Sequence, residues 1–478
     1  MDTIRRISRN LFFQGISELI VKGLQVVILI YIARFLKETE FGKFNFAIAF
    51  TAISLIFIDL GLQPLLVREI SRKNNIAGKY ISHTIIIKSV LSIIGFLIVI
   101  IIMNLMKYAP DVRLTVYLMF ISTIFKSLTD ALSSVFLALE RMHWDTFIKA
   151  LRAGLLVSLV FFGLLKNFHL IYVASMYAIT EFIVLLLCIA ILFTRFIKFT
   201  VKIQKGLIKY LTLESLPFAL TVLFYSIYFY IDSVMLSKMR GLYEVGIYSA
   251  AYNLTIALVS IPYIYVYSIF PSLSRFYVNS RGSIEFAYKK SLLYISLIAL
   301  PITAILFFAG DNIIHFLYGP GYHKSVLVLK IVAITIFFRF ITFVNGIVII
   351  SIDKQKQRLY YQGATAIINI VLNFVLIPYY GYLGAAIATV ATELFLFITY
   401  FSPVAEYLKT WHYISLLIKP AIAGLIASLL FFISINTFIK IALFLILYFV
   451  LLLMLKVFKS EDWDIFKRIL TAFKNKET

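Results

Sequence analysis

Charged residues and cysteines are scarce in this sequence. Asp, Glu, Lys and Arg make up 14% of its 478 residues, whereas about a quarter of the residues in soluble domains are charged. The single cysteine, Cys188, lies in an apolar segment. A disulfide framework is therefore excluded, and thiol redox chemistry is not expected. The shortage of charged residues points away from a soluble globular domain.

Recognisable catalytic motifs are absent as well. No Gly-x-x-x-x-Gly-Lys-Ser/Thr phosphate loop occurs, which excludes ATP hydrolysis by that route, and no His-Glu-x-x-His occurs. The histidines are scattered and indicate no metal site. A membrane glycosyltransferase or polysaccharide polymerase is expected to carry a sizeable extramembrane loop with paired carboxylates, and no such loop is present. The enzyme hypothesis is therefore disfavoured, and no organic cofactor is expected.

Apolar residues dominate instead. Hydrophobic residues make up 62% of the chain, and the mean hydropathy is +0.96. A helix needs about 20 mostly apolar residues to cross a bilayer. The pattern predicts an all-α polytopic membrane protein with fourteen spans, at residues 12–35, 41–67, 80–105, 114–139, 146–166, 170–195, 213–236, 245–271, 287–309, 325–351, 358–378, 382–402, 415–435 and 437–458.

Basic residues are unevenly distributed over the loops between these spans. One set of loop ends carries 28 Lys and Arg and the other set carries 10, and cytoplasmic loops are the ones that collect such residues. The bias predicts a multi-pass protein of the cell (plasma or inner) membrane with both termini cytoplasmic. It also explains the excess of 45 Lys and Arg over 23 Asp and Glu without a nucleic-acid partner. We expect the chain to function as a monomer among membrane lipids.

Short sequence similarities indicate an internal repeat after six spans. "ETEFGKFNFA" (38–47) resembles "LYEVGIYSAA" (242–251), and "YAITEF" (177–182) resembles "VATELF" (390–395), so that Glu181 corresponds to Glu393. Because six is even, the two halves enter the membrane in the same orientation, and such repeats are related by an axis along the membrane normal. We expect two six-helix lobes around a central cavity, at residues 1–209 and 210–408, with the last two spans and the tail at 409–478.

Several segments resemble a known group of transporters. "IPYYGYLGAAIAT" (377–389), preceded by "NIVLNFVLIP" (369–378), is similar to the motif that opens the twelfth span of polysaccharide and oligosaccharide-lipid flippases. "FIDLGLQPLLVREISR" (57–72) and "YIDSVMLSKMRGLYEVGIYSAAYNL" (230–254) also resemble that group. These flippases belong to the multidrug/oligosaccharidyl-lipid/polysaccharide exporter superfamily. The resemblance implies movement of a polyprenyl-linked oligosaccharide from the cytoplasmic to the outer leaflet, for the assembly of cell-surface glycans.

Basic residues inside the spans are the candidates for substrate contact. A charge at the bilayer centre costs at least about 2.5–3.5 kcal/mol on insertion scales, so a buried Lys or Arg needs a partner or a function. The phosphate of a lipid-linked sugar requires a cationic path, and Arg and Lys both bind phosphate. The candidates, in order of preference, are Arg339, Lys126, Lys88, Lys22 and Arg152. The alternative is local pairing, as Glu18 with Lys22 or Asp130 with Lys126 at helical spacing.

Four acids inside the spans are a second set of candidates: Asp59, Asp232, Glu181 and Glu393. Each could bind a coupling Na⁺ or H⁺, or neutralise a neighbouring base. Neutralisation is the favoured interpretation for each of them, and Glu18 joins the set as the neighbour of Lys22. The duplication of Glu181 and Glu393 suggests a role common to both lobes rather than a single ion site.

Two other functions stay open at this level. A cation-coupled multidrug exporter of the same superfamily is disfavoured by the excess of embedded bases over acids. A lipid scramblase without sugar selectivity is the other alternative.

Closely spaced tyrosines in "YSIYFYID" (225–232) and "IPYIYVYSIFP" (261–271) either pack and anchor the helices or stack on sugars. We expect Arg339→Ala to impair transport without lowering the amount of protein in the membrane.

Overall fold

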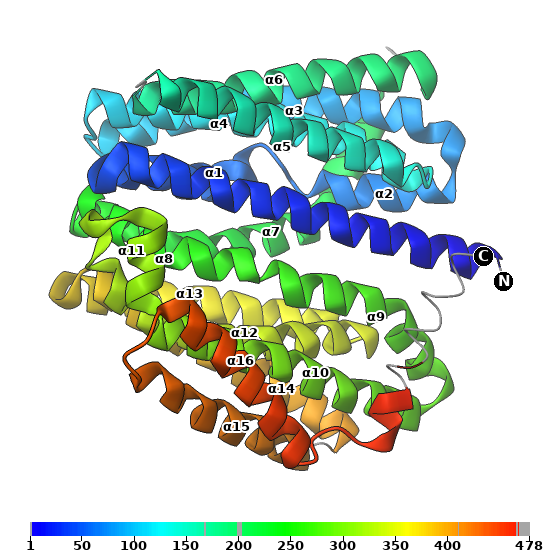
Figure 1. The fold of residues 1–478 in the computed structure, drawn as a ribbon. Coiled ribbons are helices and arrows are strands. Elements are labelled where there is room, and N and C mark those ends of the chain that lie inside the picture. The colour runs from blue at the N-terminus through cyan, green and yellow to red at the C-terminus, as the bar shows by residue number, and fades with distance from the viewer. Residues whose placement is uncertain (1, 167–168, 198–202, 410, 465–466, 468–478) are drawn as a thin grey trace.

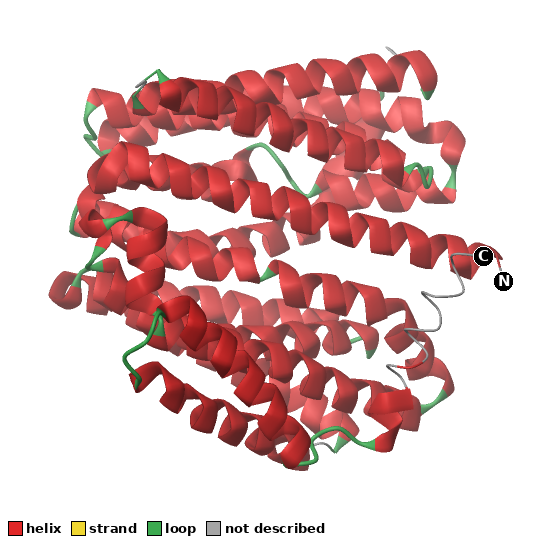
Figure 2. Cartoon of the chain, viewed as in Figure 1, coloured by secondary structure: helices red, strands yellow, loops and turns green. Residues whose placement is uncertain are grey.

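The computed structural model describes residues 2–166, 169–197, 203–409, 411–464 and 467, with the backbone alone for residues 2–20 and a few others. Every regular element in these ranges is a helix (Figure 2). The α-helices are α1 (Asp2–Ser54), α2 (Leu62–Arg72), α3 (Ala77–Leu105), α4 (Pro110–Ala138), α5 (Met142–Leu165), α6 (Leu170–Arg195), α7 (Lys205–Met239), α8 (Leu242–Leu258), α9 (Ser260–Asn279), α10 (Arg281–Phe308), α11 (Gly310–Tyr318), α12 (Ser325–Ser351), α13 (Gln355–Tyr380), α14 (Tyr382–Leu408), α15 (Ile418–Ser428) and α16 (Thr437–Met454).

The helices confirm the predicted all-α membrane architecture. Within the described residues, 13 helical segments are long and apolar enough to cross a membrane. The first of them, Val21–Phe57, runs through a kink at Lys37, whose backbone leaves the helical region with φ 59° and ψ −178°. The two arms of α1 on either side of this kink correspond to the first two predicted spans. The 13 segments are therefore compatible with fourteen crossings.

The second predicted span, 41–67, is not one continuous helix. Its helix ends at Ser54, a short 3₁₀ turn covers Leu55–Phe57, and a new helix, α2, begins at Leu62. Gly61 precedes α2 at φ +70°, and a Cβ there would lie 2.5 Å from the Cβ of Phe218 in α7. Glycine thus permits both the turn and the close approach of α7. Sequence hydropathy could not detect this break because the residues on both sides of it are apolar.

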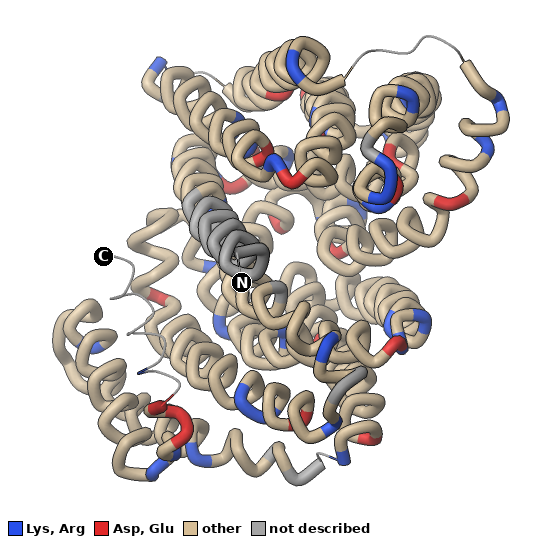
Figure 3. Tube along the Cα trace, turned by 90° about the vertical axis from the view of Figure 1, so that its right-hand side faces the viewer, with Lys and Arg blue, Asp and Glu red and all other residues tan. Residues whose placement is uncertain are grey.

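The helices form two bundles (Figure 1). Helices α2 to α6 lie on one side and α8 to α16 on the other, with α1 and α7 between them; Figure 3 shows the two bundles end-on. The first half of α7 packs on the first bundle, where Leu211 joins Leu62, Leu65 and Ile87 in one apolar cluster. The predicted lobe boundary at 209/210 therefore falls inside α7, a helix that contacts both lobes.

Helices α15 and α16 stand at the edge of the second bundle, where they pack on α10. The segment after α16 is fixed by Asp462, whose carboxylate accepts hydrogen bonds of 2.6 Å from Lys290 and from Tyr294. Burial acts to raise the pKa of Asp462, but these hydrogen bonds outweigh it and hold the pKa below its usual value. The carboxylate therefore stays ionised and ties the end of the described chain to α10.

The first pair of repeated segments meets at the interface between the lobes. A Cβ on Gly42 would lie 1.7 Å from the carbonyl oxygen of Leu242, and a Cβ on Gly246 would lie 1.9 Å from that of Glu38. The contact is reciprocal, as expected of two segments related by a pseudo-two-fold axis. Because α1 reaches its kink here after running the length of the bundle, this contact lies at the end opposite the start of the chain (Figure 1).

Gly42→Ala tests this contact. The new methyl group has to displace the backbone of α8, and overpacking of this kind costs about 1–3 kcal/mol. We expect a lower apparent melting temperature of the purified protein. Gly154→Ala in α5 is the control, because no atom lies within 4 Å of the added Cβ. Equal melting temperatures for the two variants would contradict the close approach of α1 and α8.

Candidate functional site

A cavity of about 510 Å³ lies between the two lobes. Helix α1 contributes Lys22, Gln25 and Asn45 to its lining, and α6 contributes Tyr177. The second lobe contributes a largely aromatic wall that consists of Tyr225, Phe229 and Tyr230 from α7, Tyr252 from α8, Tyr263 from α9 and Phe343 from α12. A size of this order is typical of sites that bind a small molecule or a headgroup. The cavity is the candidate binding site.

Lys22 lies on the cavity wall. Among the five cations predicted to contact substrate, all of them within the described residues, it is the one that lines this cavity. Its side chain is exposed. Glu18, its predicted neighbour on the same helix face, has a side chain that lies outside the described part of the structure. Lys22 is therefore placed to meet an anion that enters between the lobes.

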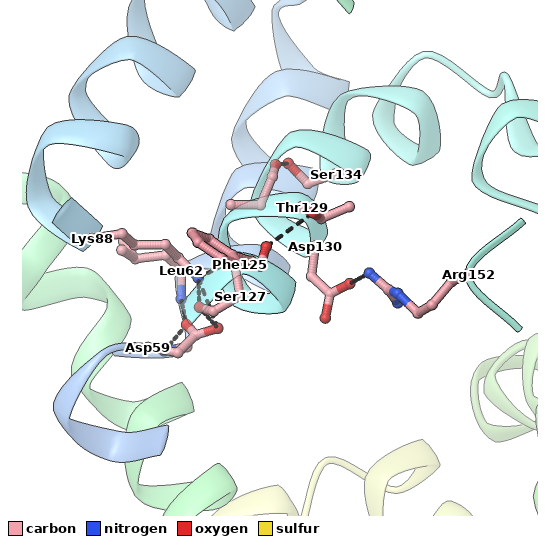
Figure 4. Close-up of polar contacts among 11 residues, drawn as sticks. Asp59, Leu62, Lys88, Phe125, Ser127, Thr129, Asp130, Ser134 and Arg152 are labelled. Atoms are coloured by element: carbon pink, nitrogen blue, oxygen red, sulfur yellow. Dashed lines mark hydrogen bonds and ion pairs between the residues drawn. The ribbon is translucent and has the colours of Figure 1, made fainter. Parts of the chain in front are cut away.

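Lys88 is held at the break that follows α1 (Figure 4). Its buried ammonium group donates to Asp59 Oδ2 at 2.8 Å, to the carbonyl oxygen of Ser127 at 3.0 Å and to Ser127 Oγ at 2.6 Å. The other oxygen of Asp59 accepts hydrogen bonds from the backbone N–H groups of Gly61 and Leu62. All three donors of Lys88 are thus used, and the pair fixes the start of α2 against α3 and α4.

Arg152 joins three helices of the first lobe. Its Nη2 donates to Asp130 Oδ1 at 3.2 Å (Figure 4). Its Nε donates to Glu181 Oε2 at 3.0 Å, so the guanidinium of α5 bridges α6 and α4. Lys126 is exposed and close enough to interact electrostatically with both carboxylates. Asp130 was predicted to pair with Lys126, and its carboxylate accepts a hydrogen bond from Arg152.

Arg339 is engaged in the second lobe. Its Nε donates to Glu393 Oε2 at 2.8 Å, with exposed side-chain fractions of 2% and 1%. The hydroxyl of Tyr228 donates to the same oxygen. The guanidinium also faces the rings of Phe229 at 5.1 Å and Tyr252 at 5.9 Å, within the range of cation–π contact. Arg339 therefore lies behind the aromatic wall of the cavity rather than on its surface.

The two lobes repeat this base–acid arrangement. Glu181 and Glu393 lie on α6 and α14, and each is close to a base on the helix beside it, Lys126 on α4 and Arg339 on α12. The bases follow similar residues, "TIFK" at 123–126 and "TIFFR" at 335–339. This similarity is a sequence signal that was not used above, and it places Arg339 and Glu393 on neighbouring helices of one lobe.

Asp232 differs from the other three acids. It is fully buried and accepts hydrogen bonds from Tyr248 at 2.8 Å, Thr389 at 2.9 Å and Asn373 at 2.5 Å. The described residues place no Lys or Arg at ion-pair distance from it. The buried Oδ1 of Asn373 accepts no hydrogen bond. Asn373 and Thr389 belong to the family-like motif, but spacing alone could not show that they converge on α7.

Comparisons with known proteins agree with one another. The family model described as "Polysaccharide biosynthesis protein" matches residues 7–277, and that described as "MatE" matches residues 217–375. A putative O-antigen transporter of Shigella flexneri is 25% identical over 81% of this chain and 94% of its own length. A putative O-antigen transporter of Escherichia coli (strain K12) is 29% identical, over 34% of this chain and 39% of its own length.

Among solved structures, the fold is similar to one described as "Lipid II flippase MurJ, inward closed conformation". The TM-score is 0.74 at 16% identity, and the match covers 96% of this chain and 100% of that one. The relatives are named as transporters or flippases. They confirm the resemblance that the sequence motifs indicated and disfavour the enzyme hypothesis.

The ion pair alters the expectation for Arg339. Removing one partner of a buried pair costs about 3–5 kcal/mol because it leaves the other charge uncompensated. We expect Arg339→Met alone to lower the yield of folded protein, and Arg339→Met with Glu393→Gln to restore most of it. The measurement is a double-mutant cycle on thermal unfolding. Lys330→Met is the matched control, because its partner Asp311 is 64% exposed and exposed pairs contribute little. Additive effects of the two substitutions would contradict the pairing.

Proposed function

Because the chain belongs to the polysaccharide biosynthesis protein family, we propose that it is a flippase that moves a lipid-linked oligosaccharide from the cytoplasmic to the outer leaflet. The observation that carries the proposal is the cavity between two repeat-related lobes, with Lys22 on one wall and aromatic side chains on the other. Rocking of parallel repeats about a fixed site gives alternating access. The chain is a multi-pass transporter, and we place both termini in the cytoplasm on the basis of the loop charges.

The chemistry of a polyprenyl-linked sugar matches this cavity. Its phosphate or diphosphate needs a cation, its glycan needs polar and aromatic contacts, and its tail stays in lipid. Lys22 supplies the cation at the cavity wall. Lys88, Arg152 and Arg339 are bound by acids of their own lobes and act as positioning residues that hold the helices around the cavity. Lys126 lies near the two acids bound by Arg152.

Asp232 is our candidate for binding a coupling cation. The other three acids neutralise Lys88, Arg152 or Arg339, whereas Asp232 is surrounded by neutral hydrogen-bond donors. Its carboxylate, Asn373 Oδ1 and Thr389 Oγ1 are oxygen ligands of the kind that hard cations prefer. Na⁺ would bind among these oxygens, and H⁺ would bind to the carboxylate itself. Either ion would add positive charge where α7, α13 and α14 meet.

A multidrug exporter is the second candidate, favoured by the match of the MatE model and by the buried carboxylate of Asp232. The positive charge on the cavity wall favours a flippase over a multidrug exporter. Lys22 on the wall repels a cationic drug and attracts a phosphate. The lipid-linked oligosaccharide is therefore the better substrate for this cavity.

Reconstituted transport tests the proposed function. In proteoliposomes that contain undecaprenyl diphosphate oligosaccharide, we expect the full-length protein to expose the glycan to the opposite side. Lys22→Ala should slow this at least about tenfold, a loss of about 1.4 kcal/mol of binding, with the amount of protein unchanged because the side chain is exposed. Ethidium is the alternative cargo. Transport of ethidium without transport of the glycan would overturn the flippase assignment.

Substitution of Asp232 tests the coupling step. Asp232→Asn keeps the size of the side chain and removes its charge, so we expect transport to lose its dependence on an imposed Na⁺ or H⁺ gradient. The measurement is the flipping rate with and without each gradient. Asp311→Asn is the matched control, because this carboxylate is 64% exposed. Full gradient dependence in Asp232→Asn would exclude Asp232 as the ion site.

A further inference from the structure

The two walls of the cavity differ in chemistry. Lys22 on α1 is the one charged residue among the described side chains that line the cavity. The opposite wall, built by α7, α8 and α9, presents the aromatic rings of Tyr225, Phe229, Tyr252 and Tyr263. A ligand that touches both walls therefore places its anion at the first lobe and an apolar face at the second.

The rings of the aromatic wall are accessible from the cavity. Tyr225 and Tyr263 line it and are 46% and 42% exposed. Tyr252 is fixed by stacking on Tyr248, with ring centroids 5.1 Å apart and planes inclined by 24°. Its buried hydroxyl lies beside the Arg339 guanidinium, which can only donate, and no hydrogen-bond acceptor among the described residues is paired with it. A buried polar group without a partner is costly, and a hydroxyl group of a ligand in the cavity would supply one.

Neutral polar groups surround these rings. Ser233, Ser249, Ser260 and Asn253 line the same wall. Asn253 donates a hydrogen bond of 2.8 Å to Asn45 of the other lobe, which orients both amides at the cavity. A pyranose ring has C–H groups on its faces and hydroxyl groups around its rim. Aromatic faces beside hydroxyl and amide groups are complementary to that pattern.

We propose that the second-lobe wall binds an uncharged sugar, a hexose or N-acetylhexosamine, directly next to the phosphate held by Lys22. The inference rests on the proposed function and names its substrate class. An acidic sugar would place a second anion against aromatic faces and neutral groups, and a buried charge without a partner is costly. Arg339, the nearest cation behind the wall, is already bound to Glu393. The cavity volume of about 510 Å³ accommodates a headgroup of a few sugars rather than a polymer.

Binding measurements on the full-length protein in nanodiscs test this specificity. The probes are farnesyl phosphate, farnesyl phosphoglucose and farnesyl phosphoglucuronate. We expect the glucose probe to bind about tenfold more tightly than either of the others, which corresponds to about 1.4 kcal/mol. Equal affinity for the glucose and glucuronate probes would overturn the proposal.

Tyr252→Phe isolates the contribution of this hydroxyl. We expect about a three- to tenfold loss of affinity for the glucose probe, the effect of one hydrogen bond, with unchanged affinity for farnesyl phosphate. Tyr379→Phe is the control, because Tyr379 is 78% exposed and lies outside the cavity lining. An unchanged glucose affinity in Tyr252→Phe would also contradict the proposal.

The outcomes separate this inference from the proposed function. If farnesyl phosphate binds in a Lys22-dependent manner but glucose adds no affinity, the sugar site is wrong and the flippase assignment stands. If no farnesyl probe binds and Lys22→Ala has no effect, the assignment itself fails.

Discussion

The structure depends on one constraint, which is that a charge placed among apolar helices must be neutralised within reach of its side chain. Lys88 with Asp59, Arg152 with Asp130 and Glu181, and Arg339 with Glu393 satisfy this constraint, and each set joins different helices. Two further charged residues stand out by their positions. Lys22 lines the cavity between the lobes, and Asp232 is buried among neutral donors. We assign the first to the substrate and the second to the coupling ion.

Each lobe is held together by ion pairs between its own helices. The cavity that we propose as the binding site lies between the two lobes. Glu181 binds Arg152 within the first lobe and Glu393 binds Arg339 within the second, while Gly42 and Gly246 bring α1 and α8 into direct contact between the lobes. Rigid lobes that touch through small residues at one end can rock about the cavity between them. Helix α7 contributes to both lobes, since Leu211 packs with the first and Asp232 with the second.

Hydropathy was sufficient to predict the all-α membrane fold, with a number of crossings compatible with the 13 helical segments. The motifs at 57–72, 230–254 and 369–389 were sufficient to indicate the family. The gap predicted between residues 35 and 41 contains the kink at Lys37. The break at Gly61 could not be predicted, because it depends on a contact with α7 rather than on composition. Sequence also ranked Arg339 first as a cavity cation because its neighbours are apolar. Apolar neighbours indicate that a side chain is buried. A buried Arg needs a counter-ion, and Arg339 forms its ion pair with Glu393, which lies 54 residues further along the chain. Lys22 was ranked fourth, and it is the one of the five predicted cations that lines the cavity.

The central claim is that the headgroup binds between Lys22 and the aromatic wall of the second lobe. Photo-crosslinking with a diazirine-bearing undecaprenyl diphosphate oligosaccharide, followed by mass-spectrometric mapping of the labelled peptides, tests it most directly. The account predicts labels on α1 near Lys22 and on α7 to α9 near Tyr225, Tyr252 and Tyr263. Labels confined to α4 to α6 around Lys126 and Arg152 would contradict it.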